Sequence, residues 1–394
     1  MKQLNLTTLF TLPLMAFCSY AHESGVDETP THLTLKTAMS FQNKATTDEV
    51  WMILGLLMGG ESTPRLKGAA IDDTQLTGKL VLEDQVSVHG KIGFHQHAGE
   101  GELSLEELWF NKIFQLNHSR LDVEIGLMAT DITSTANHHA SQSQFNTKPL
   151  LAQTFFGGHH KDTGVKSKYY WHKFQFGLEV WNGDSWPYTS SEGSKALYLT
   201  YQDTIISIDA QSGLWYSQGS ALSRQDLRYS SDHNHSNSTT LNTPENYFTG
   251  DIEMLGGFLK FTKSYSNALL LMTEFEIIES RQSGVFSDTS QSAKVKLQQT
   301  GYRGLFGLQW QNHSLVAQHE MLVVNNQFKN TTTAFIEQQG LYNKNFEPKQ
   351  TTITYNWQWQ NKVTFRLETS YDQTMINSTQ QVWSVGFTWQ HNLL

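Results

Sequence analysis

The chain has 394 residues, with 37 acidic and 28 basic side chains, a formal charge of -9, 16% charged residues and 12% aromatic residues. The negative charge and the lack of a basic block argue against nucleic acid as a partner. No apolar run reaches the roughly 20 residues that a membrane helix requires. A transmembrane β-barrel shows lipid only every second residue, so this composition remains compatible with one.

Residues 1–21 have the composition of an export signal. Lys2 supplies the positive start, a mostly apolar stretch follows over 4–17, and small residues near the end provide a cleavage site. The single cysteine, Cys18, lies inside this segment. The exported chain, 22–394, would therefore have no disulfide, and a closed barrel would draw its stability from a continuous hydrogen-bond ladder instead.

Alternation of apolar and polar residues predicts strands along the whole exported chain. It is clearest near the end, where Trp383, Val385 and Phe387 alternate with polar or small residues. Period-two alternation puts bulky apolar side chains on one sheet face. That face would be the core of a soluble sandwich or the lipid-facing surface of a barrel. We expect strands at 32–42, 73–83, 86–96, 102–114, 119–129, 163–171, 173–182, 195–202, 204–218, 246–262, 267–281, 290–311, 314–326, 349–360, 362–371 and 381–391.

The connections between these strands alternate between short turns and long polar segments. The long segments are 43–72, 97–101, 130–162, 183–194, 219–245, 282–289, 327–348 and 372–380. Short turns on one rim and long loops on the other are typical of outer-membrane barrels, with periplasmic turns and extracellular loops. A secreted sandwich array would instead need linkers at domain spacing. The pattern predicts an all-β chain forming a single transmembrane antiparallel β-barrel of about sixteen strands, with fourteen or eighteen as alternatives.

Histidine is over-represented, with sixteen residues. Imidazole is a common ligand of zinc and copper, and paired histidines on a strand share one face. The alternative is that these histidines are ordinary polar residues on wet loops, since no structural zinc spacing occurs. We expect no required cofactor, and weakly bound zinc as the alternative. The candidate metal ligands are His95, His97, His138, His139, His159, His160, His233 and His235.

Basic side chains on the polar strand faces outnumber the acidic ones in the expected lumen. Rings of charge set the ionic preference of a pore, although mixed charges also serve only to keep a lumen wet. Lys166 and Lys168, just after the longest loop, are the best candidates for a constriction. The expected pore-lining residues are Lys36, Lys79, His89, Lys91, Arg120, Lys166, Lys168, Lys173, Lys294, Lys296 and Arg366.

Residues 73–190 resemble a His-rich, zinc-associated branch of the bacterial outer-membrane porins related to phosphate-selective porins. The resemblance implies a sixteen-stranded pore, with loop 130–162 folded inward as a constriction and zinc availability controlling synthesis. At Gly126-Leu127-Met128 the family's usual Gly-Arg-Phe is replaced, which removes a lumen arginine and weakens the expectation of phosphate selectivity. The stretches that carry the resemblance are Gly93–Glu100, Glu102–Phe110, His138-His139, Pro149–Gly158, Asp162–Val165 and Gly177–Pro187.

The function expected from these features is passive diffusion of small hydrophilic or ionic solutes through a porin in the bacterial outer membrane. Expected partners are outer-membrane lipid, lipopolysaccharide and solutes, with a homotrimer left open. One alternative is a barrel whose His-rich loops capture or sense metal ions. Another is a substrate-specific receptor, although the short segment before the first strand leaves no room for its usual plug domain. No Gly-x-Ser-x-Gly nucleophile motif occurs, so we expect no enzymatic activity.

Overall fold

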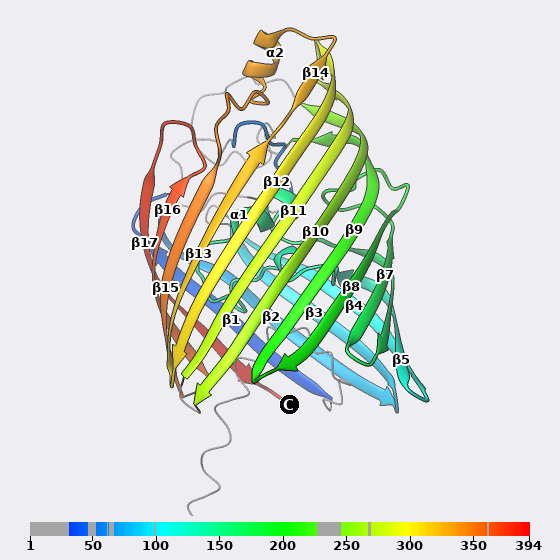
Figure 1. The fold of residues 1–394 in the computed structure, drawn as a ribbon, viewed down its shortest axis with the longest axis vertical. Helices are drawn as coiled ribbons and strands as arrows, with labels where there is room; N and C mark the ends of the chain where they lie inside the picture. The colour runs from blue at the N-terminus through cyan, green and yellow to red at the C-terminus, as the bar shows by residue number, and fades with distance from the viewer. Residues whose placement is uncertain are drawn as a thin grey trace, which may run out of the picture.

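The computed structural model describes residues 31–45, 53–60, 62, 67–97, 100–226, 246–266, 269–360 and 362–394, with only the backbone at 96, 97, 100 and 266. The expected export signal lies outside these residues. Antiparallel strands close into a barrel, because β1 pairs with both β2 and β17 while β9 pairs with β10 (Figure 1). Neither helix in the described part of the chain is long and apolar enough to cross a membrane.

Each expected strand is present, and most extend beyond their expected bounds. The strands are β1 (His32–Gln42), β2 (Gly68–Glu83), β3 (Val86–His97), β4 (Glu100–Leu116), β5 (Ser119–Ala129), β6 (Lys161–Trp171), β7 (Phe174–Trp181), β8 (Ser194–Ile205), β9 (Ile208–Gln225), β10 (Tyr247–Ser266), β11 (Leu269–Ser287), β12 (Ser292–Trp310), β13 (His313–Val324), β14 (Gln327–Lys329), β15 (Lys349–Trp359), β16 (Val363–Gln373) and β17 (Gln380–Asn392). Short β14 continues the line of β13 along β12, so the wall of the closed barrel has 16 strands, as predicted.

The short turns differ from the sequence prediction at two places. The break expected between strands 246–262 and 267–281 is wrong in position, because β10 continues to Ser266. The break expected at Gln202-Asp203 is wrong, because β8 continues to Ile205 and the turn falls at Ile206-Ser207, which have φ angles of 50° and 62°. Left-handed angles at both central residues are those of a type I′ turn, whose twist matches the flanking strands. Asn-Gly is the usual signal for that turn, and Ile-Ser gives no such signal. Its absence explains the error.

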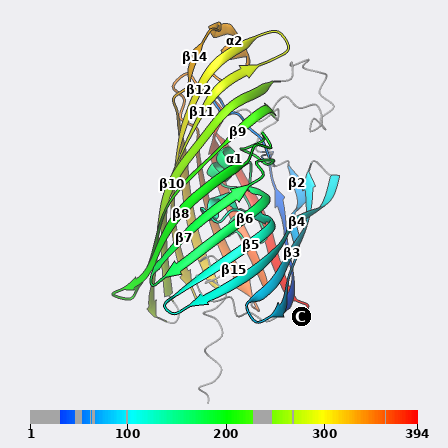
Figure 2. The ribbon, with the colours of Figure 1, turned by 90° about the vertical axis from the view of Figure 1, so that its right-hand side faces the viewer.

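Strands β10 to β12 rise above the rest of the barrel on one side (Figure 2). Along β12 the apolar side chains change from the inner face in the upper part to the outer face in the lower part. In the lower part of β12, Tyr302 and Phe306 point outward and are 42% and 52% exposed, as expected of lipid-facing residues. In the upper part Val295 and its inward neighbours are buried, whereas Lys294 and Lys296 are exposed on the outer face. The expectation that these two lysines line the pore is therefore corrected.

Apolar loop residues fill the space behind this raised wall. They come from 53–60, 130–160 and 182–193, and they pack against inward side chains of β10 to β13. Helix α1 (Leu150–Phe156) lies inside the barrel, whereas α2 (Thr333–Gln338) sits on top of the wall (Figure 1). We call this buried cluster the lumen core. Its principal members are Ile53, Leu56, Met58, Leu150, Leu151, Phe156, Trp186, Phe248, Ile252, Met254, Phe286, Val295, Leu297 and Phe335.

Candidate functional site

Loop 130–160 crosses the barrel interior and is held by glutamates on the opposite wall. At the start of the loop, the hydroxyl groups of Thr133 and Thr135 donate hydrogen bonds to Glu276 of β11. Thr133 is the N-cap of the single helical turn η4 (Ser134–Ala136), and Thr135 lies within that turn. One buried carboxylate therefore fixes the first turn of the loop to the wall.

The same arrangement occurs at the start of helix α1. The backbone N–H groups of Leu150 and Leu151 donate to the carboxylate of Glu320 on β13, at 2.8 and 3.0 Å. The preceding residue, Pro149, offers no side-chain cap, so Glu320 supplies the acceptor that a capping side chain would normally provide. Glu320 is completely buried. Glu320, on the barrel wall, thus caps the N-terminus of helix α1.

Strand β16 provides the third attachment. The carboxylate of Glu368 accepts hydrogen bonds from the backbone N–H groups of Asn146 and Thr147, at 2.8 and 3.0 Å. On the same strand Arg366 donates to the carbonyl oxygens of Ala140, Ser143 and Phe145. Arg366 points inward as expected, but its guanidinium is used to hold the loop. The loop is therefore tied to β11, β13 and β16.

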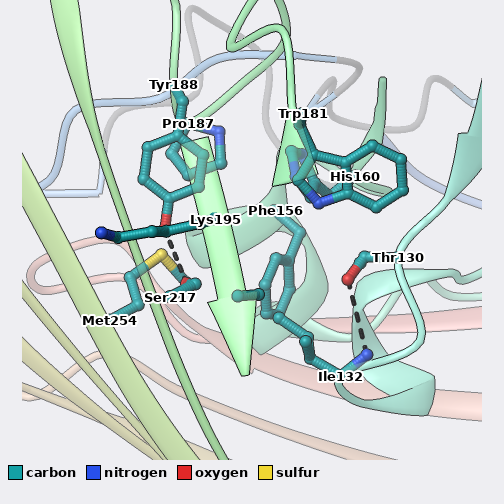
Figure 3. Close-up of a pocket in the computed structure, with 11 residues that line it drawn as sticks. Thr130, Ile132, Phe156, His160, Trp181, Pro187, Tyr188, Lys195, Ser217 and Met254 are labelled. Carbon is teal, nitrogen blue, oxygen red and sulfur yellow. Dashed lines mark hydrogen bonds between the residues drawn. The ribbon is translucent and has the colours of Figure 1, made fainter. Parts of the chain in front are cut away.

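A small cavity remains between loop 130–160 and the wall, where the lumen core meets the His160 side chain (Figure 3). Its volume of about 10 Å³ leaves room for one water molecule at most. His160 donates from Nδ1 to the carbonyl oxygen of Trp186 at 2.8 Å, and burial lowers the pKa of His160. Tyr188 and Ser217 share a hydrogen bond of 2.6 Å across the cavity. The cavity is too small for a solute, so it belongs to the packing of the loop.

The expected constriction lysines lie inside the barrel but are paired. Lys166 lies 2.9 Å from Glu124 and 2.8 Å from Asp131 of the loop, and Lys168 lies 2.5 and 3.2 Å from the same two carboxylates. Arg120 is likewise paired with Asp122. Two cations facing two anions leave little net charge. The basic wall inferred from the sequence is thus neutralised by acids that the expectation underweighted.

A β-bulge brings two further acids, Glu106 and Glu107, into the lumen. The register shifts between Lys91 and Ile92, where Lys91 pairs with Glu107 and Ile92 with Leu105. The extra residue, Glu106, therefore points inward together with Glu107, as a bulge allows. Glu107 forms an ion pair with Lys91. Strict alternation would have placed one of the two carboxylates in lipid.

Other expected pore-lining residues divide between lumen and rim. Lys36 and Lys79 point inward from β1 and β2, and Lys79 is buried. His89 stacks on Trp109 with ring centroids 3.8 Å apart. Lys173 instead lies in the turn between β6 and β7, where its side chain is 55% exposed and its Nζ atom lies 2.6 Å from Asp203 on the short-turn rim. The expectation that Lys173 lines the pore is therefore corrected.

Three of the expected metal ligands converge below the loop. His95 Nε2 and His159 Nε2 lie 3.1 and 3.4 Å from the two oxygens of Glu106. Nδ1 of His95 and of His139 lie 3.8 and 3.9 Å from Asp73. The rings of His139 and His159 are 5.1 Å apart. Two carboxylates and three imidazoles thus connect the loop to β2, β3 and β4.

This cluster does not have the geometry of a metal site. Among the residues that the structure describes, no three His, Cys, Asp or Glu side chains are placed to hold a metal ion. His138 lies apart, where burial and then nearby cations lower its pKa to about 3. Burial also lowers the pKa of His139 well below its usual value. His233, His235 and the His97 side chain lie outside the described residues.

Comparisons with known proteins support the fold. No protein-family model and no curated protein matches the sequence. A loop-deletion mutant of OmpT, an outer membrane protein of Vibrio cholerae, aligns at 11% identity and a TM-score of 0.52, covering 92% of this chain and 98% of that one. The trimer form of OmpT aligns at 10% identity and 0.51, covering 92% and 100%. OprB of Pseudomonas putida aligns at 11% and 0.52, covering 92% and 94%.

At this level of identity the likeness concerns the fold alone. The chain has the closed 16-strand antiparallel barrel of outer-membrane porins. None of the comparisons shows a zinc-associated or phosphate-related family.

Proposed function

We propose that this protein is an outer-membrane channel through which small hydrophilic solutes diffuse passively. The observation that carries the proposal is loop 130–160, which lies across the interior and is tied to wall carboxylates on three strands. An inward loop of this kind narrows the interior of a barrel. Diffusion needs no chemistry at the site, which agrees with a lumen of paired charges.

The paired charges support weak ionic selectivity. Lys166 and Lys168 face Glu124 and Asp131, so the narrow region offers hydrogen-bonding groups of both signs. Rings of unpaired charge are what give a pore strong preference for one sign of ion. We therefore propose neutral or zwitterionic solutes, and small ions of either sign, as the permeating class.

Conductance of the purified protein in a planar lipid bilayer tests the proposal. Discrete ohmic steps are expected from the folded protein. Asn146 Nδ2 and Ser384 Oγ are 3.0 Å apart. A disulfide formed in the double variant Asn146→Cys, Ser384→Cys should lock the loop and suppress larger conductance states until it is reduced. Each single-cysteine variant is the control, since the chain 22–394 has no cysteine of its own. Folded, inserted protein that never conducts would contradict the proposal.

Metal capture is a second candidate, favoured by the approach of His95, His139 and His159 to Asp73 and Glu106. Zinc would have to draw these groups closer than they stand. A homotrimer is also proposed, because a trimer form exists for OmpT, whose barrel has the same fold. Chemical cross-linking in detergent, followed by mass measurement, tests that assembly.

A further inference from the structure

The outer face of the raised wall carries three lysines close together. Lys294 and Lys296 point outward from the upper part of β12, and Lys329 points outward from β14. Lys294 and Lys329 are direct cross-strand partners, and Gln327 faces Lys296. All three lysines are exposed. We call them the wall lysines.

The surroundings of the wall lysines provide no counter-charge. On the other side of β12, Lys294 faces Val285 and Lys296 faces Ser283. Among the described residues no ion pair involves a wall lysine. Two like charges directly opposite each other are destabilising in a sheet. An anion bound between Lys294 and Lys329 would remove that cost.

The outward acids Glu253 and Glu279 on the neighbouring strands already have a basic partner. Glu279 on β11 is already paired with Arg281 of the same strand at 2.7 Å. Glu253 of β10 faces Arg281 across the sheet. Arg281 is thus a basic partner for both carboxylates, and Glu279 also accepts a hydrogen bond from Gln298 of β12 at 2.8 Å. The positive patch is confined to β12 and β14, on a chain whose net charge is -9.

The height of the patch indicates what it faces. Tyr302 is the uppermost outward aromatic residue on β12, at the expected upper edge of the lipid-facing belt. With about 3.3 Å per residue and a tilt of about 45°, Lys296 stands roughly 14 Å above Tyr302. A lysine side chain also extends down toward the interface along its own stem. The ammonium groups are then at the level of the phosphorylated headgroups of the outer leaflet.

We propose that the wall lysines bind the phosphate groups of lipopolysaccharide, on lipid A and the adjoining inner core. This inference rests on the proposed location in the outer membrane. The patch offers three ammonium groups from two adjacent strands, and a lipid A molecule offers two phosphates above its acyl chains. Its acyl chains would pack on the apolar belt below, which includes Tyr302 and Phe306.

Binding of bisphosphorylated lipid A to the full chain in detergent tests the proposal. In the triple variant Lys294→Gln, Lys296→Gln, Lys329→Gln, affinity should fall on the order of tenfold or more at low salt, because each lysine near an anionic lipid surface contributes about fivefold. A second triple variant loses the same charge at the periplasmic rim, through Lys173→Gln, Lys263→Gln and Lys362→Gln, and should bind as the parent does.

Thermal stability gives an independent readout. Without lipid A, Lys329→Gln should leave the melting temperature unchanged or raise it, since it removes the repulsion with Lys294. With lipid A present, the same change should lower the melting temperature relative to the parent. A merely structural lysine would shift both measurements in the same direction.

Three results would overturn the proposal. Equal loss of binding in both triple variants would indicate a general charge effect, and equal binding of dephosphorylated lipid A would indicate apolar contact only. Inorganic phosphate that competes at concentrations similar to lipid A would indicate a free-anion site. Because binding in detergent does not require an open channel, it can fail while conductance is observed, or succeed where conductance fails.

Discussion

Replacing Glu320 with Gln should loosen loop 130–160 without unfolding the barrel. Glu320 accepts two backbone hydrogen bonds from the start of α1, and the neutral amide can accept only through its single oxygen. The loss of charge-assisted bonding at two N–H groups costs about 2–4 kcal/mol. That change shifts the equilibrium between docked and undocked loop by roughly 30- to 1000-fold. The attachments at Glu276 and Glu368 remain, so only the α1 half of the loop is freed.

Single-channel recording measures the population shift directly. The Glu320→Gln variant should visit larger conductance states far more often than the parent protein. The control is Glu274→Gln on β11, an inward carboxylate that lies 2.7 Å from Arg303 and 3.6 Å from Lys260 and bonds to no loop residue in the described chain. Its conductance fluctuations should match the parent. Identical records from Glu320→Gln and the parent, with both proteins folded, would refute the anchoring role of the glutamate.

Three further outcomes follow from particular positions. On β11, Phe275→Arg should impair assembly, because a lipid-facing charge costs about 2–4 kcal/mol. Ser283→Arg, on the outer face, should be tolerated, whereas Phe286→Arg, at a buried position, should displace the loops. Heat-modifiable gel mobility measures all three outcomes. Because the pKa of buried His138 is lowered to about 3, its loop stays docked at neutral pH and loses stability as the pH falls below about 6.5. Protease cleavage of the loop should therefore increase toward pH 5, and the increase should be smaller in His138→Gln. Micromolar zinc should alter the channel current at pH 7.5 and much less at pH 5.5, with a weaker response in His95→Gln; a response that persists under both changes would assign it to carboxylates.

Local alternation was enough to predict the barrel. Each lipid-facing strand in the lower half repeats the same pattern, as in Trp357 and Phe365 on adjacent strands, whose rings are 5.5 Å apart. The period of two depends only on neighbouring residues, so a sequence reveals it directly. The number of strands, and the alternation of short turns on one rim with long loops on the other, followed from counting these segments.

Which face of a strand contacts water depends on its height relative to the membrane. The alternation of apolar and polar residues carries no information about that height. On β12 the apolar side chain of Val295 points inward to the lumen core, while apolar Phe306 on the same strand points outward to lipid. A reading that assigns every polar residue to the lumen therefore places Lys294 on the wrong side. The correct side requires knowing that 53–60 and 130–160 return into the barrel, which is long-range information.

The roles of the inward acids were hidden for a similar reason. A folded loop inside a barrel brings backbone N–H groups out of water, and each of them needs an acceptor. Carboxylates are acceptor-only groups, so Glu276, Glu320 and Glu368 are suited to this task wherever the loop passes. Charges consumed in this way cannot also act on a passing ion. Selectivity should then depend on inward charges that stay partly exposed, such as Lys260 and Glu274, which are 20% and 15% exposed and stand 3.6 Å apart, one of each sign.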